Sequence, residues 1–351
     1  LRTTTTNILQ KLKTRTNTAY DASPKSSHRR LKIKSGLLPA TTATTTPHRI
    51  TRPDKTTASS PSAVIKAVHS HFTTELTRAT PPDLPIPPWE HHDNPDNFNI
   101  EPRGDPTLTL ADMITRDTFD KTLNSLGTGK APGPDGIPNE IIKFLPPETR
   151  STLFSLLSLL AHNSYTPPEW CHSTTCLLHK KGDPTLLDNY RPIALMNNLL
   201  KLWTALIKDA GSKSAETHGV LSDQQDGFRQ HRNIHDALSS IIMAMEDAKL
   251  HSKDIYVMYA DFKGAFNAAD HRIMFKHMRQ LGMPSTFVDT CEHLYGVSST
   301  NYITPYGPTP SIDINRGTLQ GDTLSPFLFT LFLEPFLRWL TVGSRGYRPG
   351  P

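Results

Sequence analysis

Residues 255–260 form an uninterrupted apolar run, Ile-Tyr-Val-Met-Tyr-Ala, that ends directly at Asp261. The run is rich in aromatic and β-branched residues, a composition that favours a β-strand. The pattern therefore predicts a central strand that carries one carboxylate at its end, followed by a turn and a bulky aromatic, Phe266. Phosphoryl-transfer enzymes that use two Mg²⁺ ions need a carboxylate fixed in this way, although an Asp after a strand is more often a turn former or a helix N-cap.

Three further segments carry recognisable patterns. Lys130–Ile137 reads Lys-Ala-Pro-Gly-Pro-Asp-Gly-Ile, Asn189–Asn197 reads Asn-Tyr-Arg-Pro-Ile-Ala-Leu-Met-Asn, and Arg316–Pro326 reads Arg-Gly-Thr-Leu-Gln-Gly-Asp-Thr-Leu-Ser-Pro. Taken in this order with Asp261, they resemble the fingers and palm of reverse transcriptases, over roughly residues 112–340. The loop at 130–137 is the best argument for the subfamily of non-LTR (LINE-type) retrotransposons. The resemblance implies an α+β fold, a fingers-and-palm fragment of a right-hand polymerase.

The resemblance also implies a reaction and its partners. In this family a primer 3′-hydroxyl attacks the α-phosphate of a deoxynucleotide and releases pyrophosphate. The implied partners are an RNA template, a DNA primer and deoxynucleoside triphosphates, and the implied cofactor is Mg²⁺ or Mn²⁺. By resemblance, Asp261 ligates both ions and the backbone carbonyl of Phe262 completes one site, so that the ions neutralise charge on the transferred phosphorus.

Three residues are expected at the nucleotide. Phe266 resembles the steric gate that excludes a ribose 2′-hydroxyl, with core packing as the alternative. In the Gln320–Gly321 pair, the glycine lets backbone approach a ligand closely and the Gln can hydrogen-bond template or nucleotide. The interpretation requires Asp261 to face this pair across the site.

Cationic side chains upstream resemble those of the family's fingers. Lys181 and Arg191 are expected to neutralise the incoming triphosphate, Arg191 through two hydrogen bonds and Lys181 as a point charge. Arg229 and Arg232 lie in the segment between fingers and palm. For these two, contact with template or primer and a structural role in capping or salt bridges are equally open.

The second acidic strand of this family, usually Tyr-Ala-Asp-Asp, is not found before Pro351. One carboxylate cannot hold two mutually repelling Mg²⁺ ions, so we expect the isolated chain to lack measurable polymerase activity. Two hypotheses remain open, a piece of an active element or a degenerate relic with at most weak nucleic-acid binding. Asn267, where the family usually has Asp, suggests drift, and the reading frame beyond Pro351 would distinguish the two.

Charge and composition divide the chain. Residues 1–55 hold twelve Lys and Arg against two Asp, a net charge of +10 in a chain of +5, so the remainder carries about −5. The negative body argues against a plain nucleic-acid-binding module. The Thr-rich, basic residues 1–55 have too few apolar side chains for burial to offset the loss of backbone entropy on folding. Pro81–Pro88 is a stiff linker. We therefore expect residues 1–106 to be a disordered basic Thr/Pro-rich tail and linker, with a short helix over 63–77, and residues 107–351 to form the reverse transcriptase domain.

Compartment and local structure complete the expectations. Three cysteines and no apolar stretch long enough to cross a bilayer favour an intracellular protein, in nucleus or cytoplasm, without a membrane partner. Periodicity predicts a strand over 174–179 and a hairpin over 301–314. Helices are expected around residues 119–126, 138–143, 153–160, 199–210, 237–245, 270–281, 287–295 and 325–340, the last with Ser325 as its N-cap.

Overall fold

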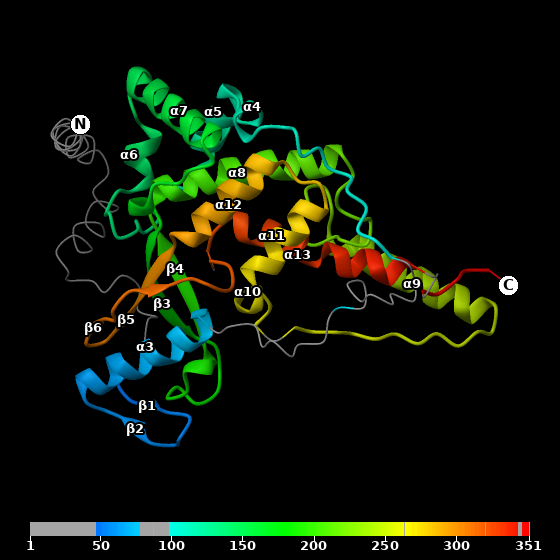
Figure 1. The fold of residues 1–351 in the computed structure, drawn as a ribbon. Helices are drawn as coiled ribbons and strands as arrows, with labels where there is room; N and C mark the ends of the chain where they lie inside the picture. The colour runs from blue at the N-terminus through cyan, green and yellow to red at the C-terminus, as the bar shows by residue number, and fades with distance from the viewer. Residues whose placement is uncertain are drawn as a thin grey trace.

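The computed structural model describes residues 47–77, 87, 98–262, 264–319, 321–342 and 346–350. It contains helices, a five-stranded mixed sheet and a separate two-stranded antiparallel sheet, which confirms the mixed α and β composition expected from the sequence. The helices lie above and beside the five-stranded sheet, and the N-terminal helix α3 (Pro61–Thr77) lies below it (Figure 1).

The sheet is built around two strands that form a hairpin. β3 (His172–His179) and β4 (Tyr190–Met196) pair antiparallel in a register that sets Leu178 opposite Arg191. The strand expected over 174–179 is confirmed as part of β3, and β5 (Ser299–Thr304) adds parallel to its first half, over residues 172–175. The short strands β6 (Gly307–Pro308) and β7 (Ile312–Asp313) both fold back antiparallel onto β5, as the predicted hairpin requires.

Helices supply the larger of two apolar cores. Trp203 of α8 is fully buried at its centre, and its indole N–H donates to Thr166 Oγ1 at 2.9 Å. Helices α11 and α13 pack against each other and, with α12, against this core. The helices after the N-terminal one are α4 (Leu110–Met113), α5 (Arg116–Ser125), α6 (Asn139–Lys143), α7 (Pro147–His162), α8 (Asn198–Thr217), α9 (Ile234–Leu250), α10 (Ala265–Ala268), α11 (His271–Gln280), α12 (Ser285–Gly296) and α13 (Leu324–Thr341), with 3₁₀ turns η3 (Pro168–Trp170) and η4 (Leu187–Asn189).

The expected start of ordered structure near residue 107 is wrong for residues 47–77. They form β1 (Ile50–Thr51), β2 (Thr57–Ala58) and α3 (Pro61–Thr77). α3 buries Val64, Val68 and Phe72 at helical spacing against the underside of the sheet. These apolar residues are few, but they find a partner surface on β5 and the β3–β4 hairpin, so the segment can offset its loss of backbone entropy. Residues 1–46 lie outside the described residues.

The strand expected at 255–261 is also wrong. Residues 253–262 have no regular secondary structure, and Tyr256 and Tyr259 are 91% and 82% exposed. In Figure 1 this segment runs back beneath α9 toward α10 without a neighbouring strand. A strand is held by pairing of its backbone N–H and C=O groups, and no strand among the described residues pairs with this run.

The expected helices form, with differences confined to their ends. α13 begins at Leu324 rather than Ser325, so Ser325 is not its N-cap; its hydroxyl is buried and donates to the Leu319 carbonyl at 2.9 Å. In the part of the chain that the structure describes, no helix combines the length and hydropathy needed to cross a bilayer.

Candidate functional site

The segment around Phe266 and the segment that begins at Arg316 lie against each other. The Thr318 N–H donates to the Phe266 carbonyl and the Gly317 N–H to the Ala269 carbonyl, both at 2.8 Å. Arg316 Nε donates to the Ala268 carbonyl at 3.0 Å. Backbone bonds of this kind fix the two segments in register, so two of the motifs recognised in the sequence form one structural unit.

Glycine permits this close approach at two positions. A Cβ on Gly317 would lie 2.9 Å from the Asn267 Cα, and one on Gly321 would lie 3.2 Å from the Ala194 carbonyl oxygen. Both glycines have positive φ, 79° and 112°, a region that other residues rarely adopt. Ala194 lies on β4, within the motif at 189–197. The close approach of Gly321 therefore places that motif against the segments that contain Phe266 and Arg316. Gln320 lies outside the described residues.

A small cavity marks the meeting point of the three motifs. Its volume is about 40 Å³, and Pro192, Ala194, Asn267 and Thr318 are among its lining residues. The C-terminal end of α3 closes it from below, where the Asn315 N–H donates to the Leu76 carbonyl at 3.1 Å. Ligand sites commonly measure several hundred Å³, so this cavity does not hold a nucleotide without rearrangement.

The ring of Phe266 is part of an aromatic group. It lies 4.7 Å from the Phe329 ring of α13, centroid to centroid, and 6.0 Å from the Phe228 ring in an edge-to-face arrangement. Phe266 itself is only partly buried. The ring thus packs against two aromatic neighbours while part of the side chain stays exposed, and its role as a steric gate stays a prediction.

Asp261 and Phe262 lie at the end of the unpaired segment, and both side chains are exposed. The fit to a pair of Mg²⁺ ions is poor. Among the described residues, the one place where three or more metal-ligating side chains converge involves neither of them. Two ions held together need several carboxylate oxygens, and Asp261 supplies only its own.

Asp322 is the residue that sequence reasoning missed. It follows Gly321 directly, is buried, and accepts a 2.6 Å hydrogen bond from the Thr204 hydroxyl of α8. Burial raises the pKa of Asp322 to about 6, against the opposing effect of the Thr204 hydroxyl, nearby backbone N–H groups and Lys201. The position of Asp322 directly after Gly321 was the sequence signal that could have marked it as a candidate site residue.

Lys201 connects this carboxylate to the loop at 130–137. Burial lowers the pKa of Lys201, while the charges of Asp322 and Asp135 act to raise it. The Asp135 N–H donates to Asn197 Oδ1 at 3.1 Å, which ties the loop to the start of α8. The loop that pointed to LINE-type enzymes is thus joined through α8 to the segment that carries Gly321.

Lys181 and Arg191 both lie on the β3–β4 hairpin with exposed side chains. Neither side chain forms an ion pair with a carboxylate among the described residues. Two exposed cations without an internal partner on one hairpin are available to an anionic ligand.

Arg229 and Arg232 are occupied by contrast. Arg229 forms two hydrogen bonds with Glu216, at 2.9 and 2.7 Å, and donates to the Ser222 carbonyl at 2.7 Å. Arg232 pairs with Asp223 at 2.5 Å and with Asp226 at 3.6 Å. These contacts favour the structural alternative, most clearly for Arg229, whose side chain is 8% exposed.

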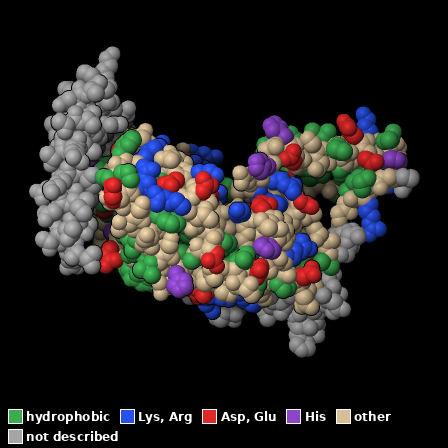
Figure 2. Space-filling model, turned by 90° about the horizontal axis from the view of Figure 1, so that it is seen from above, with side chains coloured by type: hydrophobic (Ala, Val, Ile, Leu, Met, Phe, Trp, Pro, Cys, Tyr) green, Lys and Arg blue, Asp and Glu red, His purple; other side chains and the backbone are tan. Residues whose placement is uncertain are grey.

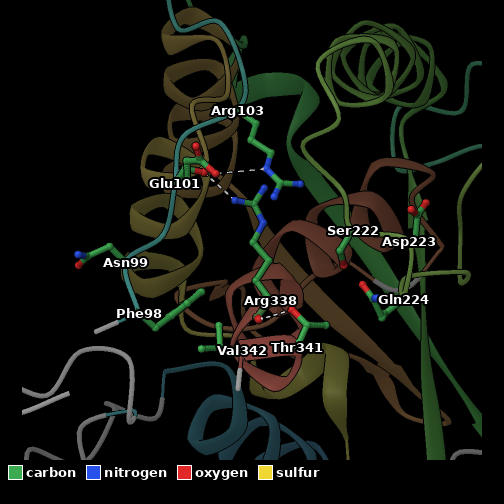
Figure 3. A pocket seen from close by; sticks show the side chains of 10 residues that line it. All are labelled: Phe98, Asn99, Glu101, Arg103, Ser222, Asp223, Gln224, Arg338, Thr341 and Val342. Atoms are coloured by element: carbon green, nitrogen blue, oxygen red, sulfur yellow. Dashed lines mark hydrogen bonds and ion pairs between the residues drawn. The ribbon is translucent and has the colours of Figure 1, made fainter. Parts of the chain in front are cut away.

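A larger pocket of about 300 Å³ lies at the far end of α13 (Figure 3). Arg338 lies at its floor, where its Nε donates to Glu334 Oε1 at 2.9 Å and its guanidinium also donates to the backbone carbonyls of Glu101 and Val220. None of the sequence-predicted site residues lines this pocket. Arg338 is thus engaged in holding α13 to neighbouring segments.

Charges on the face seen in Figure 2 are mixed. Lysine and arginine side chains of the described residues are interspersed there with Asp and Glu, so this face carries no continuous basic stripe. A stripe of that kind is what a plain nucleic-acid-binding module requires.

Comparison with known proteins decides the family. Residues 178–344 match the family model for reverse transcriptase (RNA-dependent DNA polymerase). This range contains Lys181 and Arg191, called the hairpin cations below, and also Phe266 and Gly321. These residues belong to the reverse transcriptase family. The resemblance inferred from the motifs is thereby confirmed.

Relatives of the reverse transcriptase segment come from mobile elements. The chain is 25% identical over 60% of its length to "Probable RNA-directed DNA polymerase from transposon BS" of Drosophila melanogaster, covering 23% of that protein. It is 24% identical over 62% of its length to the RNA-directed DNA polymerase from mobile element jockey of the same species, covering 24% of it. It is 28% identical over 59% of its length to the Pol polyprotein from type-1 retrotransposable element R2 of Popillia japonica, covering 28% of it. The chain thus matches about a quarter of the length of these relatives.

Proposed function

We propose that this chain is the fingers and part of the palm of a retrotransposon RNA-directed DNA polymerase. Its template is RNA, its primer DNA and its substrates deoxynucleoside triphosphates, which places its work in the nucleus or cytoplasm. The observation that carries the proposal is the junction at Thr318, where the segments of Phe266, Gly321 and β4 meet within the range of the family match. Three motifs far apart in the sequence lie together, as a shared nucleotide site requires.

The hairpin cations bind the triphosphate in this proposal. Arg191 lies on β4 and Lys181 in the loop that joins β3 to β4; both side chains are exposed, and neither has an internal partner among the described residues. A triphosphate carries several negative charges, and planar guanidinium groups bind phosphate oxygens through paired hydrogen bonds. Arg191 therefore orients the phosphates and Lys181 adds charge.

Phe266 and Gly321 form the floor of the same site. The partly buried ring of Phe266 is fixed by Phe329, so its free edge has a defined position against a sugar. Gly321 leaves backbone accessible, and Gln320 beside it contacts the template or nucleotide. Arg232, with 32% of its side chain exposed, remains the better candidate of the two arginines for a nucleic-acid contact.

Metal binding is incomplete in the described residues. Mg²⁺ or Mn²⁺, when bound, supplies neutralisation of the charge that develops on the transferred phosphorus. Asp261 and the Phe262 carbonyl would hold their share of such ions, but both lie on an exposed, unpaired segment. We therefore propose that the 351-residue chain by itself does not polymerise.

Photolabelling tests the nucleotide site without requiring catalysis. An azido-dATP probe should label a peptide within 172–196, and unlabelled dNTPs should compete with it. The double variant Lys181→Ala, Arg191→Ala should reduce labelling about tenfold, since two charge-assisted contacts are lost. Lys180→Ala, which removes a neighbouring cation, is the matched control and should leave labelling nearly unchanged. Equal labelling of the double variant and the unmodified chain would contradict the assignment.

A further inference from the structure

Three metal-ligating side chains that belong to none of the motifs discussed above converge beside them. His71 and Glu75 lie one turn apart on α3, and Asp188 comes from η4 at the tip of the β3–β4 hairpin. One ligand atom of each lies within 4.8 Å of the other two. In the part of the chain that the structure describes, this is the only group of three or more His, Cys, Asp or Glu side chains with that property.

The positions of these side chains follow from the packing beneath them. Leu187, the neighbour of Asp188, is buried in the same apolar cluster as Val68 and Phe72 of α3. The hairpin loop is also bonded to β1, where the Thr51 N–H donates to the Thr185 carbonyl at 3.0 Å. The fold therefore holds Asp188 opposite one face of α3, on two independent attachments.

Residues at i and i+4 share one face of a helix, so the His71 ring and the Glu75 carboxylate point the same way. Their nearest atoms, His71 Nε2 and Glu75 Oε1, are 3.8 Å apart. The ligand atoms around tetrahedral Zn²⁺ are about 3.4 Å from one another, given Zn–N and Zn–O bonds of about 2.0–2.2 Å. Asp188 is exposed and Glu75 partly so, which leaves their side chains free to close the remaining gap.

Charge favours a cation at this place. The fold brings the Glu75 and Asp188 carboxylates together, and like charges at short range repel each other. A divalent ion relieves that repulsion. An ion also uses the neutral imidazole as a ligand, and the set of one imidazole and two carboxylates suits Zn²⁺ and similar transition metals.

We propose that His71, Glu75 and Asp188 form a divalent transition-metal site that fastens α3 to the β3–β4 hairpin, with Zn²⁺ as its occupant. The fourth ligand is water. The site is structural, and it lies on the hairpin that carries Lys181 and Arg191. The inference is independent of the proposed polymerase function, because none of its ligands belongs to the motifs that support that function.

Co²⁺ titration of the full 351-residue chain tests the site, because Co²⁺ at a four-coordinate site absorbs visible light. We expect saturable binding of one Co²⁺ per chain, displacement by Zn²⁺, and a higher Tm with Zn²⁺ present. His71→Ala and Asp188→Asn should each weaken binding at least tenfold and remove the Zn²⁺-dependent rise in Tm. His69→Ala, on the same helix and outside the group, is the control and should bind as the unmodified chain does.

Three outcomes would overturn the proposal. They are the absence of saturable Co²⁺ binding, equal binding by the two ligand variants and the unmodified chain, and near-ultraviolet bands of a cobalt–thiolate site. Asp188 is exposed, so Asp188→Asn should fold normally, and its circular dichroism spectrum establishes this before the titration.

Discussion

Asp322 shows how one buried carboxyl joins two parts of the site. Its hydrogen bond from Thr204 fixes the segment after Gly321 to α8, and Lys201 lies near enough to influence both Asp322 and Asp135. A buried carboxylate is costly, so the folded protein favours the protonated form, and the pKa of Asp322 rises to about 6.

The stability of the chain should therefore fall as Asp322 ionises. Its pKa is near 3.8 when unfolded and about 6 when folded, so the contribution is complete below pH 4 and is lost as pH rises through 6. Asp322→Asn stays neutral and keeps an acceptor for Thr204, and should stabilise the protein at pH 7.5 by roughly 1–3 kcal/mol.

Thermal melts at pH 4.5 and 7.5 measure this effect. The difference in Tm between Asp322→Asn and the unmodified chain should be larger at the higher pH. The exposed Asp313→Asn is the control and should change little at either pH. A destabilised Asp322→Asn at pH 7.5 would mean that the charged carboxylate, through Lys201, stabilises the fold.

Gly133 gives a second prediction at the scale of one residue. A Cβ at this position would lie 2.4 Å from the Asn197 backbone nitrogen, a contact that backbone must move to relieve. Gly133→Ala should therefore cost about 1–3 kcal/mol of unfolding free energy in urea titrations. Gly127→Ala, which meets only the flexible Lys130 side chain at 3.4 Å, should cost much less. Equal losses would show that the 130–137 loop is not held against Asn197.

At the scale of elements, helices were predictable and one strand was not. The helical periodicity of α8, α11 and α13 is local, and each element forms where its pattern indicates. The 255–261 run has a stronger strand composition than β3, yet only β3 forms, because β4 pairs along one edge of β3 and β5 pairs with residues 172–175 on the other. The residues of a strand do not determine which other strands pair with it.

Hydrogen exchange distinguishes these two segments. Backbone amides of 255–261 should exchange within seconds, since they have no paired strand among the described residues, whereas those of 174–178 should be protected by many orders of magnitude. The free energy of unfolding of the whole protein sets the upper limit for the protection of the β3 amides. Protection of 255–261 comparable to that of β3 would show that the run is paired in solution.

α3 was expected only as a short helix within a disordered tail, because its apolar residues are few. In the structure, the Phe72 ring stacks on the Tyr302 ring of β5 with centroids 4.0 Å apart. Phe72→Ala should cost about 3 kcal/mol or more, as other buried Phe truncations do. Ser70→Ala, on the exposed face of the same helix, is the control. A negligible loss in Phe72→Ala would mean that residues 47–77 do not pack on the sheet.

At the scale of the whole molecule, the family and the order of its motifs could be predicted from the sequence. The exposed position of Asp261 on an unpaired segment could not. The glycines and the segment at 316–326 indicated a close junction, which Gly317 and Gly321 make with Asn267 and Ala194. The glycine beside Asp322 could mark this residue, but its hydrogen bond from Thr204 spans 118 positions and that of Arg229 with Glu216 spans 13, so local patterns predicted neither contact.

The central claim is that this chain holds a reverse transcriptase nucleotide site whose metal centre is incomplete. Primer extension on an RNA template with Mg²⁺ tests it on two chains. One is the 351-residue chain, and the other is that chain fused at its C-terminal end to polymerase sequence from the jockey relative outside the 24% that the chain matches. We predict no extension by the first, and extension by the second that Asp261→Asn abolishes. Extension by the 351-residue chain alone, or extension by the fusion that survives Asp261→Asn, would contradict the account.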